Sequence, residues 1–147
     1  MTISVRFRKL KPQAKIPMRG SEYAAGYDIT AISREYDALN DVYVYHTGLA
    51  LEIPRGYAGL LFPRSSICRQ TLMKTNGVGV IDADYRGEIL MKFAERYVSG
   101  AIESRIYKPG DRIGQLVIVQ APEVFFVEAD ELTPTERGAG GYGSTGA

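Results

Sequence analysis

The sequence is poor in the residues that enzymes use for covalent and metal chemistry. Its 147 residues include one cysteine, Cys68, one histidine, His46, and no tryptophan. A single cysteine excludes an internal disulfide and suits, without proving, a reducing cytoplasm. One histidine and one cysteine cannot build a histidine-rich metal site. We therefore expect a surface or strand-edge histidine and a buried, inert thiol.

Strong charge and long apolar runs are also missing. The net charge is +1, with 45% apolar and 24% charged residues. A net charge this small does not indicate binding to nucleic acid or to an acidic membrane surface. The N-terminus carries no apolar signal run, and nothing reaches membrane-spanning length. We expect a single globular domain with no nucleic-acid or membrane partner, in the cytoplasm or, for a viral protein, in the host-cell cytoplasm.

Short apolar or alternating runs, separated by turn residues, predict a mostly β protein. Ile3, Val5 and Phe7 alternate with polar residues, as in a strand with one buried face. Gly, Pro, Asp and Asn punctuate the later runs, and such spacing is typical of a sandwich, barrel or jelly roll. One short helix is expected over residues 65–73, with Ser65 as its cap and a shared face of Ile67, Cys68 and Leu72. The other expected strands cover residues 42–45, 49–53, 57–62, 78–81, 89–93, 113–119 and 124–127.

An apolar run leads directly into Asp82 and Asp84, and then into Tyr85 and a turn. A carboxylate at a strand end is held firmly yet faces a cleft, which suits a general base acting through one water. A polar hairpin turn, in which Asp and Gly are common, explains the same pattern. The segment alone leaves both interpretations open.

Three further positions have both a functional and a structural interpretation. Arg64, followed by Ser65 and Ser66, suits a phosphate grip, or a helix cap beside a surface arginine. Gln115 lies inside an apolar run, where its amide requires a core hydrogen bond or a ligand. For Asp28 three interpretations are open: it neutralises an arginine, it holds a hydrated metal, or it is a turn residue.

Residues 137–147 form a glycine-rich tail with one arginine, one tyrosine, a serine and a threonine. Its N–H groups can bend around phosphate oxygens, and an aromatic ring among glycines can stack on a base. The tail is not a Walker-type loop, because it lacks the lysine and the strand–helix context. Composition alone favours a flexible tail.

Together, these five segments resemble the five motifs of trimeric dUTPases, in order and with similar spacing, from Ala24 to Gly146. The resemblance implies an all-β, jelly-roll-like fold with one short helix, a β-rich domain of residues 1–136 and a C-terminal arm of residues 137–147 that closes over the active site. It implies a magnesium-dependent enzyme that hydrolyses dUTP to dUMP and pyrophosphate, which keeps uracil out of DNA and supplies dUMP for thymidylate synthesis. It also implies a homotrimer whose subunits share each active site.

The resemblance assigns roles to the matching residues. Asp82 matches the base that activates the attacking water, and Tyr85 the ring that leaves no room for a 2′-hydroxyl. Asp28 matches an acid that supports the site, partly through magnesium-bound water, while triphosphate and water hold the ion itself. Asp82, Asp28, Arg64 and Gln115 are the expected catalytic residues. The other substrate-binding matches are the phosphate contacts Ser65 and Ser66, the uracil hairpin with Asn76, Gly79, Val80 and Ile81, and the arm residues Arg137, Tyr142, Gly143, Ser144 and Thr145.

The chain departs from the family pattern in four places. Tyr142 stands where phenylalanine is usual, Ser66 where glycine is common and Gly114 where alanine is common. Residues 95–104 form a longer connection than usual. Two alternative functions remain: a dCTP deaminase of the same fold, and a nucleotide-gated binding protein that switches a regulatory protein partner, as some viral relatives do.

Overall fold

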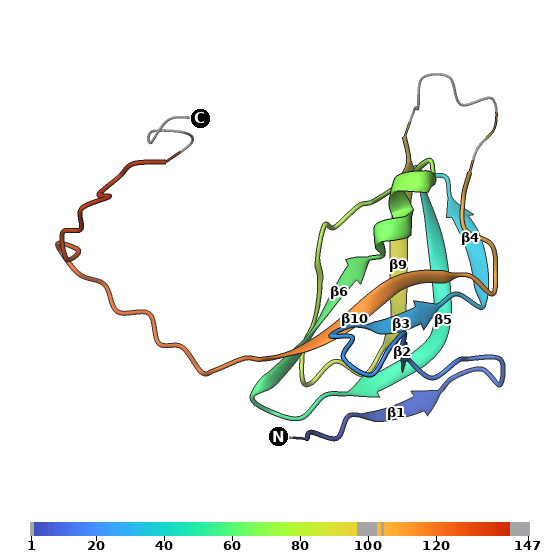
Figure 1. The fold of residues 1–147 in the computed structure, drawn as a ribbon, viewed down its shortest axis with the longest axis horizontal. Coiled ribbons are helices and arrows are strands. Elements are labelled where there is room, and N and C mark those ends of the chain that lie inside the picture. The colour runs from blue at the N-terminus through green and yellow to red at the C-terminus, as the bar shows by residue number, and fades with distance from the viewer. Residues whose placement is uncertain (1, 97–102, 104, 142–147) are drawn as a thin grey trace.

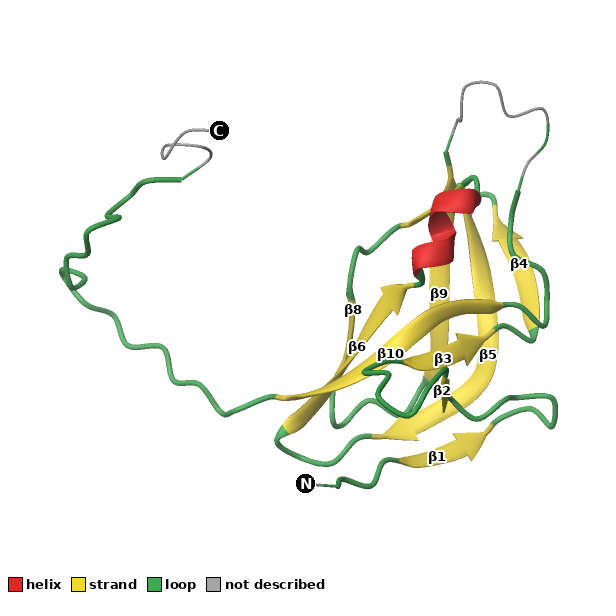
Figure 2. Cartoon of the chain, in the orientation of Figure 1, coloured by secondary structure: helices red, strands yellow, loops and turns green. Residues whose placement is uncertain are grey.

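A computed structural model describes residues 2–96, 103 and 105–141. In this part of the chain, two antiparallel sheets of five strands pack together, with one short helix at their edge (Figures 1 and 2). The all-β class expected from the sequence is confirmed. No helix in the described residues is long and apolar enough to cross a membrane.

The first sheet is organised around one long strand. Its order is β1-β5-β9-β7, and β4 also pairs with β5. The two runs expected at 42–45 and 49–53 form a single strand, because the chain passes between them through an irregularity rather than a turn. Gly48 lies there with φ 67°, a conformation that glycine adopts without strain. The strands are β1 (Arg6–Lys9), β4 (Ser33–Asp37), β5 (Val42–Glu52), β7 (Leu72–Lys74) and β9 (Glu88–Glu95).

The second sheet places the candidate site residues beside one another. Its order is β2-β3-β10-β6-β8. Because β10 lies between β3 and β6, Gln115 is paired with Asp28 on one side and with Phe62 on the other. The strands are β2 (Met18–Arg19), β3 (Tyr27–Thr30), β6 (Tyr57–Pro63), β8 (Gly79–Ile81) and β10 (Arg112–Gln120).

Aromatic side chains fill part of the core between the sheets. Tyr45, Phe93 and Tyr107 are at most 3% exposed. Their rings meet edge to face, with centroids 5.5 to 6.1 Å apart, an arrangement that adds to the stabilisation from burial. The Tyr45 hydroxyl donates to the carbonyl of Tyr107 at 3.0 Å, so its polar end is satisfied.

Gly114 is a close-packed position in β10. A methyl group there would clash with the sulfur of Met91 and lie 2.9 Å from the carbonyl oxygen of Phe62. Met91 is only 1% exposed. The space that an alanine would need is therefore filled by Met91.

The expected helix is shorter than predicted and differently capped. A 3₁₀-helix, η1, covers Ser65–Arg69, and Arg64 occupies its N-cap position without a side-chain hydrogen bond. The predicted Ser65 cap is therefore wrong. Cys68 is exposed rather than buried, because three residues per turn do not align it with Ile67 and Leu72 on one buried face. Leu72 instead begins the edge strand β7.

The strand predicted at residues 124–127 does not form in the described chain. These residues are Val124, Phe125, Phe126 and Val127, and their exposure runs from 61% to 97%. After β10 the chain leaves the two sheets and extends away from them (Figure 1). The apolar, β-branched pattern was correctly identified, but a strand also needs a neighbouring edge to pair with.

Candidate active site

Asp28 is the centre of a charged cluster on the second sheet. Its Oδ1 atom lies 2.9 Å from Nε of Arg64, and its Oδ2 atom lies 2.8 Å from Nη1 of Arg112. The Asp28 side chain is 17% exposed, so two guanidinium groups offset the cost of burying its charge. Of the interpretations open from the sequence, the geometry favours neutralisation of arginine. The sequence did not single out Arg112 as a site residue.

The other expected phosphate contacts lie around Arg64. Its Nη1 atom donates to the Ser66 hydroxyl at 3.4 Å, and Ser65 is exposed at the start of η1. Gln115 donates from Nε2 to the carbonyl of Pro63 at 3.4 Å. A Cβ atom at Gly26 would lie 2.7 Å from Oε1 of Gln115, so the missing side chain at Gly26 makes room for this amide. The structure thus brings together Asp28, Arg64, Ser66 and Gln115.

A second cluster surrounds a cavity of about 190 Å³ beside β8. Asp82 follows the last residue of β8 and is exposed, so the strand holds its backbone while its carboxylate faces solvent. A larger hollow of about 520 Å³ lies near the N-terminus, but its lining holds no carboxylate to act as a base. The smaller cavity is lined by Leu61, Asn76, Gly79, Val80, Ile81, Asp82, Tyr85, Glu88, Ile89 and Leu90, which include four of the six residues in the expected uracil hairpin at 76–81.

Tyr85 lines this cavity and is held in place by two neighbours in the chain. Its hydroxyl donates to the backbone carbonyl of Glu88 at 3.0 Å. A Cβ atom at Gly87 would lie 2.6 Å from Cζ of the Tyr85 ring, so only glycine lets the ring pack this closely. The ring remains 44% exposed, which leaves it available to a ligand in the cavity.

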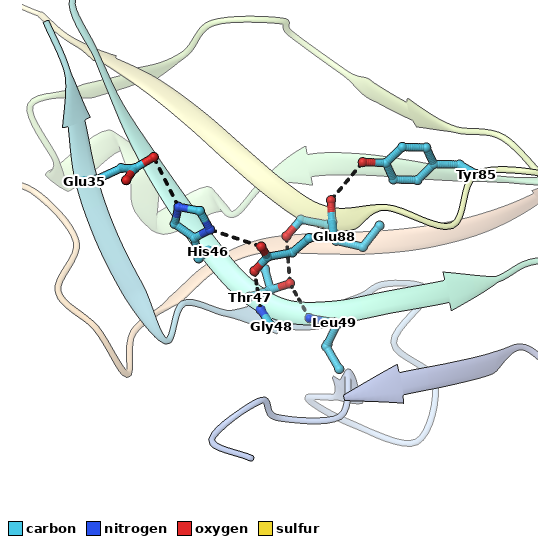
Figure 3. A network of polar contacts seen from close by, with 8 residues as sticks. Glu35, His46, Thr47, Gly48, Leu49, Tyr85 and Glu88 are labelled. Atoms are coloured by element: carbon cyan, nitrogen blue, oxygen red, sulfur yellow. Dashed lines mark hydrogen bonds and ion pairs between the residues drawn. The ribbon is translucent and has the colours of Figure 1, made fainter. Parts of the chain in front are cut away.

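Glu88 links the cavity to the central strand of the other sheet (Figure 3). Its Oε1 atom accepts from the N–H of Gly48 at 2.7 Å, and its Oε2 atom lies 3.1 Å from Nδ1 of His46. On its other side, His46 is 3.4 Å from Glu35. The sequence suggested a surface or strand-edge histidine, but at His46 β5 is paired on both sides, by β4 and β9.

This arrangement changes the acidity of the histidine. Partial burial favours the neutral ring, but the hydrogen bonds with Glu88 and Glu35 outweigh it and raise the pKa of His46 above its ordinary value of 6.5. A group with a raised pKa in the folded state contributes full stability below its unfolded pKa. That contribution is lost as the pH rises through the folded pKa.

We therefore expect the free energy of unfolding to fall as the pH rises through the raised pKa of His46, by no more than about 1 kcal/mol because the group is partly exposed. Urea unfolding of the wild type and of His46→Gln, between pH 5 and pH 9 in steps, would measure the difference. The glutamine keeps a hydrogen-bonding side chain but cannot titrate. Parallel stability curves for the two proteins would contradict this role of His46.

The two clusters lie at opposite ends of β6. Gly59 pairs with Ile81, so Asp82 lies one position beyond this pair, opposite Ala58. Arg64 follows the other end of β6. Six residues of extended strand separate these positions, which corresponds to about 20 Å.

The C-terminal arm is described only in part. Arg137 is exposed, and its Nε atom donates to the carbonyl of Gly140 at 2.9 Å within a local turn. This segment lies away from the two sheets (Figure 1). Tyr142, Gly143, Ser144 and Thr145 lie outside the described residues, as does most of the connection at 95–104.

The described residues offer no protein cage for a metal. No three His, Cys, Asp or Glu side chains among them lie together as ligands, and both oxygens of Asp28 are engaged by arginines. A Mg²⁺ ion here would have to keep phosphate and water as its ligands. Of the two carboxylates that line the cavity, Asp82 is exposed and Glu88 accepts from the N–H of Gly48.

The sequence matches the family model described as dUTPase over residues 12–146. The deoxyuridine 5′-triphosphate nucleotidohydrolase of Paramecium bursaria Chlorella virus 1 is 40% identical, with 97% of this chain and 98% of that protein covered. The protein of the same name from Thermobifida fusca is 37% identical, with 99% and 80% covered.

Solved structures give the same result for the fold. The Staphylococcus bacteriophage 80alpha dUTPase with dUPNHPP matches with a TM-score of 0.79 and 28% identity, covering 99% of this chain and 100% of that one. A dUTPase from phage phi11 of S. aureus, described with a coordinated structural Mg(II) ion, matches with a TM-score of 0.71 and 26% identity, covering 88% and 98%. With the family model spanning nearly the whole sequence and relatives matching end to end, this chain belongs to the dUTPase family.

Proposed function

We propose that this chain hydrolyses dUTP to dUMP and pyrophosphate, with magnesium, and that Asp82 is its general base. The observation that carries the proposal is the position of Asp82. It is an exposed carboxylate on a firmly held strand end, at the rim of a cavity that is also lined by Tyr85 and the hairpin of Asn76. Membership of the dUTPase family supplies the reaction.

In the proposed mechanism, Asp82 orients a water and accepts its proton as the water attacks the α-phosphorus. Arg64 binds phosphate oxygens, while Asp28 fixes the direction of its guanidinium group. Tyr85 packs against the deoxyribose and excludes a 2′-hydroxyl. Arg137 brings further positive charge from the arm. Magnesium, when bound with the triphosphate, supplies positive charge at the phosphates. Such chemistry depends on position and charge rather than on a protein nucleophile.

We propose a homotrimer with shared active sites, and the separation of the two clusters supports this proposal. Asp82 and Arg64 of one chain are about 20 Å apart along β6, too far for both to act at the α-phosphate of one bound nucleotide. Subunits arranged in a closed ring place the base of one chain beside the phosphate grip of the next. The exposed apolar run at 124–127 supports this arrangement, because such a patch marks an interaction surface.

The first test is a nucleotide panel. Incubation of the protein with Mg²⁺ and, separately, dUTP, dCTP, dTTP and UTP is expected to give dUMP and pyrophosphate from dUTP alone. Pyrophosphate release and product chromatography would measure this result. Release of ammonia from dCTP would indicate a deaminase instead. Tight binding of dUTP without turnover would indicate a nucleotide-gated binding protein.

A further inference from the structure

Lys74 occupies a position in the core that the strand pattern reserves for an apolar side chain. In β7, Met73 is 57% exposed while Leu72 and Lys74 face inward, at 2% and 7% exposure. Burial lowers the pKa of Lys74 below its ordinary value. A buried lysine costs stability, and such groups are often kept for a specific purpose.

The Lys74 side chain reaches from the edge of one sheet towards the edge of the other. Its Nζ atom lies 3.5 Å from the place where a Cβ atom of Gly79 in β8 would stand. Gly79 itself lines the cavity beside Asp82. The ammonium group of Lys74 therefore lies within van der Waals distance of the cavity wall at Gly79.

The Nζ atom donates a hydrogen bond to Oδ1 of Asn76, which also lines the cavity. An ammonium group can only donate, so the oxygen end of the Asn76 amide must face the lysine. The Nδ2 end lies 3.4 Å from the Cβ position of Gly79. Lys74 thus sets the orientation of the Asn76 amide. The NH₂ group, which donates hydrogen bonds, turns towards the cavity wall at Gly79.

We propose that Lys74 is a positioning residue that selects the pyrimidine by fixing the orientation of the Asn76 amide. The fixed NH₂ group can donate to a carbonyl oxygen, such as O4 of uracil. Against the exocyclic amino group of cytosine it would place two donors face to face, and both would lose their partners. This inference rests on the proposed function, since it concerns the choice of base at the same site.

Two substitutions of Lys74 test its hydrogen bond to Asn76. Lys74→Met keeps the length of the buried chain but frees the amide to rotate, whereas Lys74→Arg still donates only. Binding of dUMP and of dCMP is measured by calorimetry, and steady-state kinetics are measured with dUTP. We expect Lys74→Met to reduce the preference for dUMP over dCMP by about ten-fold or more. KM for dUTP should rise while kcat is nearly unchanged, and Lys74→Arg should retain the preference.

Asn76→Asp supplies an independent test, because a carboxylate presents an acceptor in either orientation. It should weaken the preference for dUMP even with Lys74 in place, and adding Lys74→Met should change the preference no further. Removal of a buried charge should leave the melting temperature of Lys74→Met equal to or above that of the wild type. If that variant misfolds, an unchanged preference in Asn76→Asp still overturns the inference, and Lys74→Arg still tests whether a donor at position 74 is enough.

An unchanged preference in a folded Lys74→Met protein would overturn the inference, as would an unchanged preference in Asn76→Asp. Failure of the proposed function is distinguishable, because a wild-type protein without dUTP turnover would still report its base preference through the binding of dUMP and dCMP.

Discussion

Replacing Asp82 with asparagine is expected to lower kcat for dUTP by about 10²–10⁴-fold, the usual contribution of a positioned general base. Asparagine has nearly the same shape but cannot accept a proton from the attacking water. Because Asp82 follows β8 and is exposed, the substitution should leave the fold intact. Steady-state kinetics with Mg²⁺ and dUTP would measure kcat, and the binding of dUMP should change only a few-fold.

Asp84 provides a matched control for this experiment. It is an exposed acid two positions away in the same loop, and it does not line the cavity. Asp84→Asn should therefore retain most of the activity while removing the same charge from the same segment. Equal losses in the two variants would indicate that the loop needs negative charge rather than a base at position 82. Near-normal turnover by Asp82→Asn would show that another group takes the proton.

Two inactive variants are expected to restore each other's activity when their subunits are mixed. Asp82→Asn removes the base, and Arg64→Gln weakens the phosphate grip while keeping a donor for Asp28. If each site takes these groups from different chains of a trimer, about a third of the sites in assemblies that contain both variants have both intact groups. Differently tagged variants, co-expressed and purified through both tags, would give the mixed assemblies for assay.

The control for this mixing experiment is a chain that carries both Asp82→Asn and Arg64→Gln. Combined with Asp82→Asn, this doubly substituted chain cannot build an intact site in any arrangement, so its mixtures should stay inactive. Recovery in the first mixture and not in the second would establish shared sites. No recovery in either, with mixed assemblies confirmed by mass, would mean that base and grip act within one chain, which the separation along β6 opposes.

The fold was largely predictable where a strand carries a strong apolar pattern. Alternating and apolar runs located β5, β6, β9 and β10, because a period of two is enforced by burial of one face. The short edge strand β4 was missed, since its five residues, SREYD, are mostly exposed and carry little apolar signal. The strand predicted at 124–127 was wrong for the opposite reason. Its composition suits a strand, but pairing depends on a neighbouring strand edge, which local sequence does not encode.

The site residues that lie close together in the sequence could be predicted. Asp82 and Tyr85 stand out in one contiguous segment and Asn76 through the family resemblance, and the structure places all three around one cavity. Arg112 and Glu88 were not singled out as site residues. Each acts across strands distant in sequence: Arg112 reaches Asp28, and Glu88 reaches His46 and Gly48. No local pattern marks such partners, because only the register of the sheets brings them into contact.

The close contact of Met91 with Gly114 sets what a substitution at position 114 requires of the surrounding residues. Alanine is common at the matching position of the family pattern. Here its methyl group would clash with the Met91 sulfur and lie too close to the Phe62 carbonyl. A single substitution to alanine therefore passes through an overpacked protein. The far end of the Met91 side chain must turn away, and β6 must yield slightly, before alanine becomes acceptable. Packing against these neighbours is thus enough to explain the glycine, without a catalytic role.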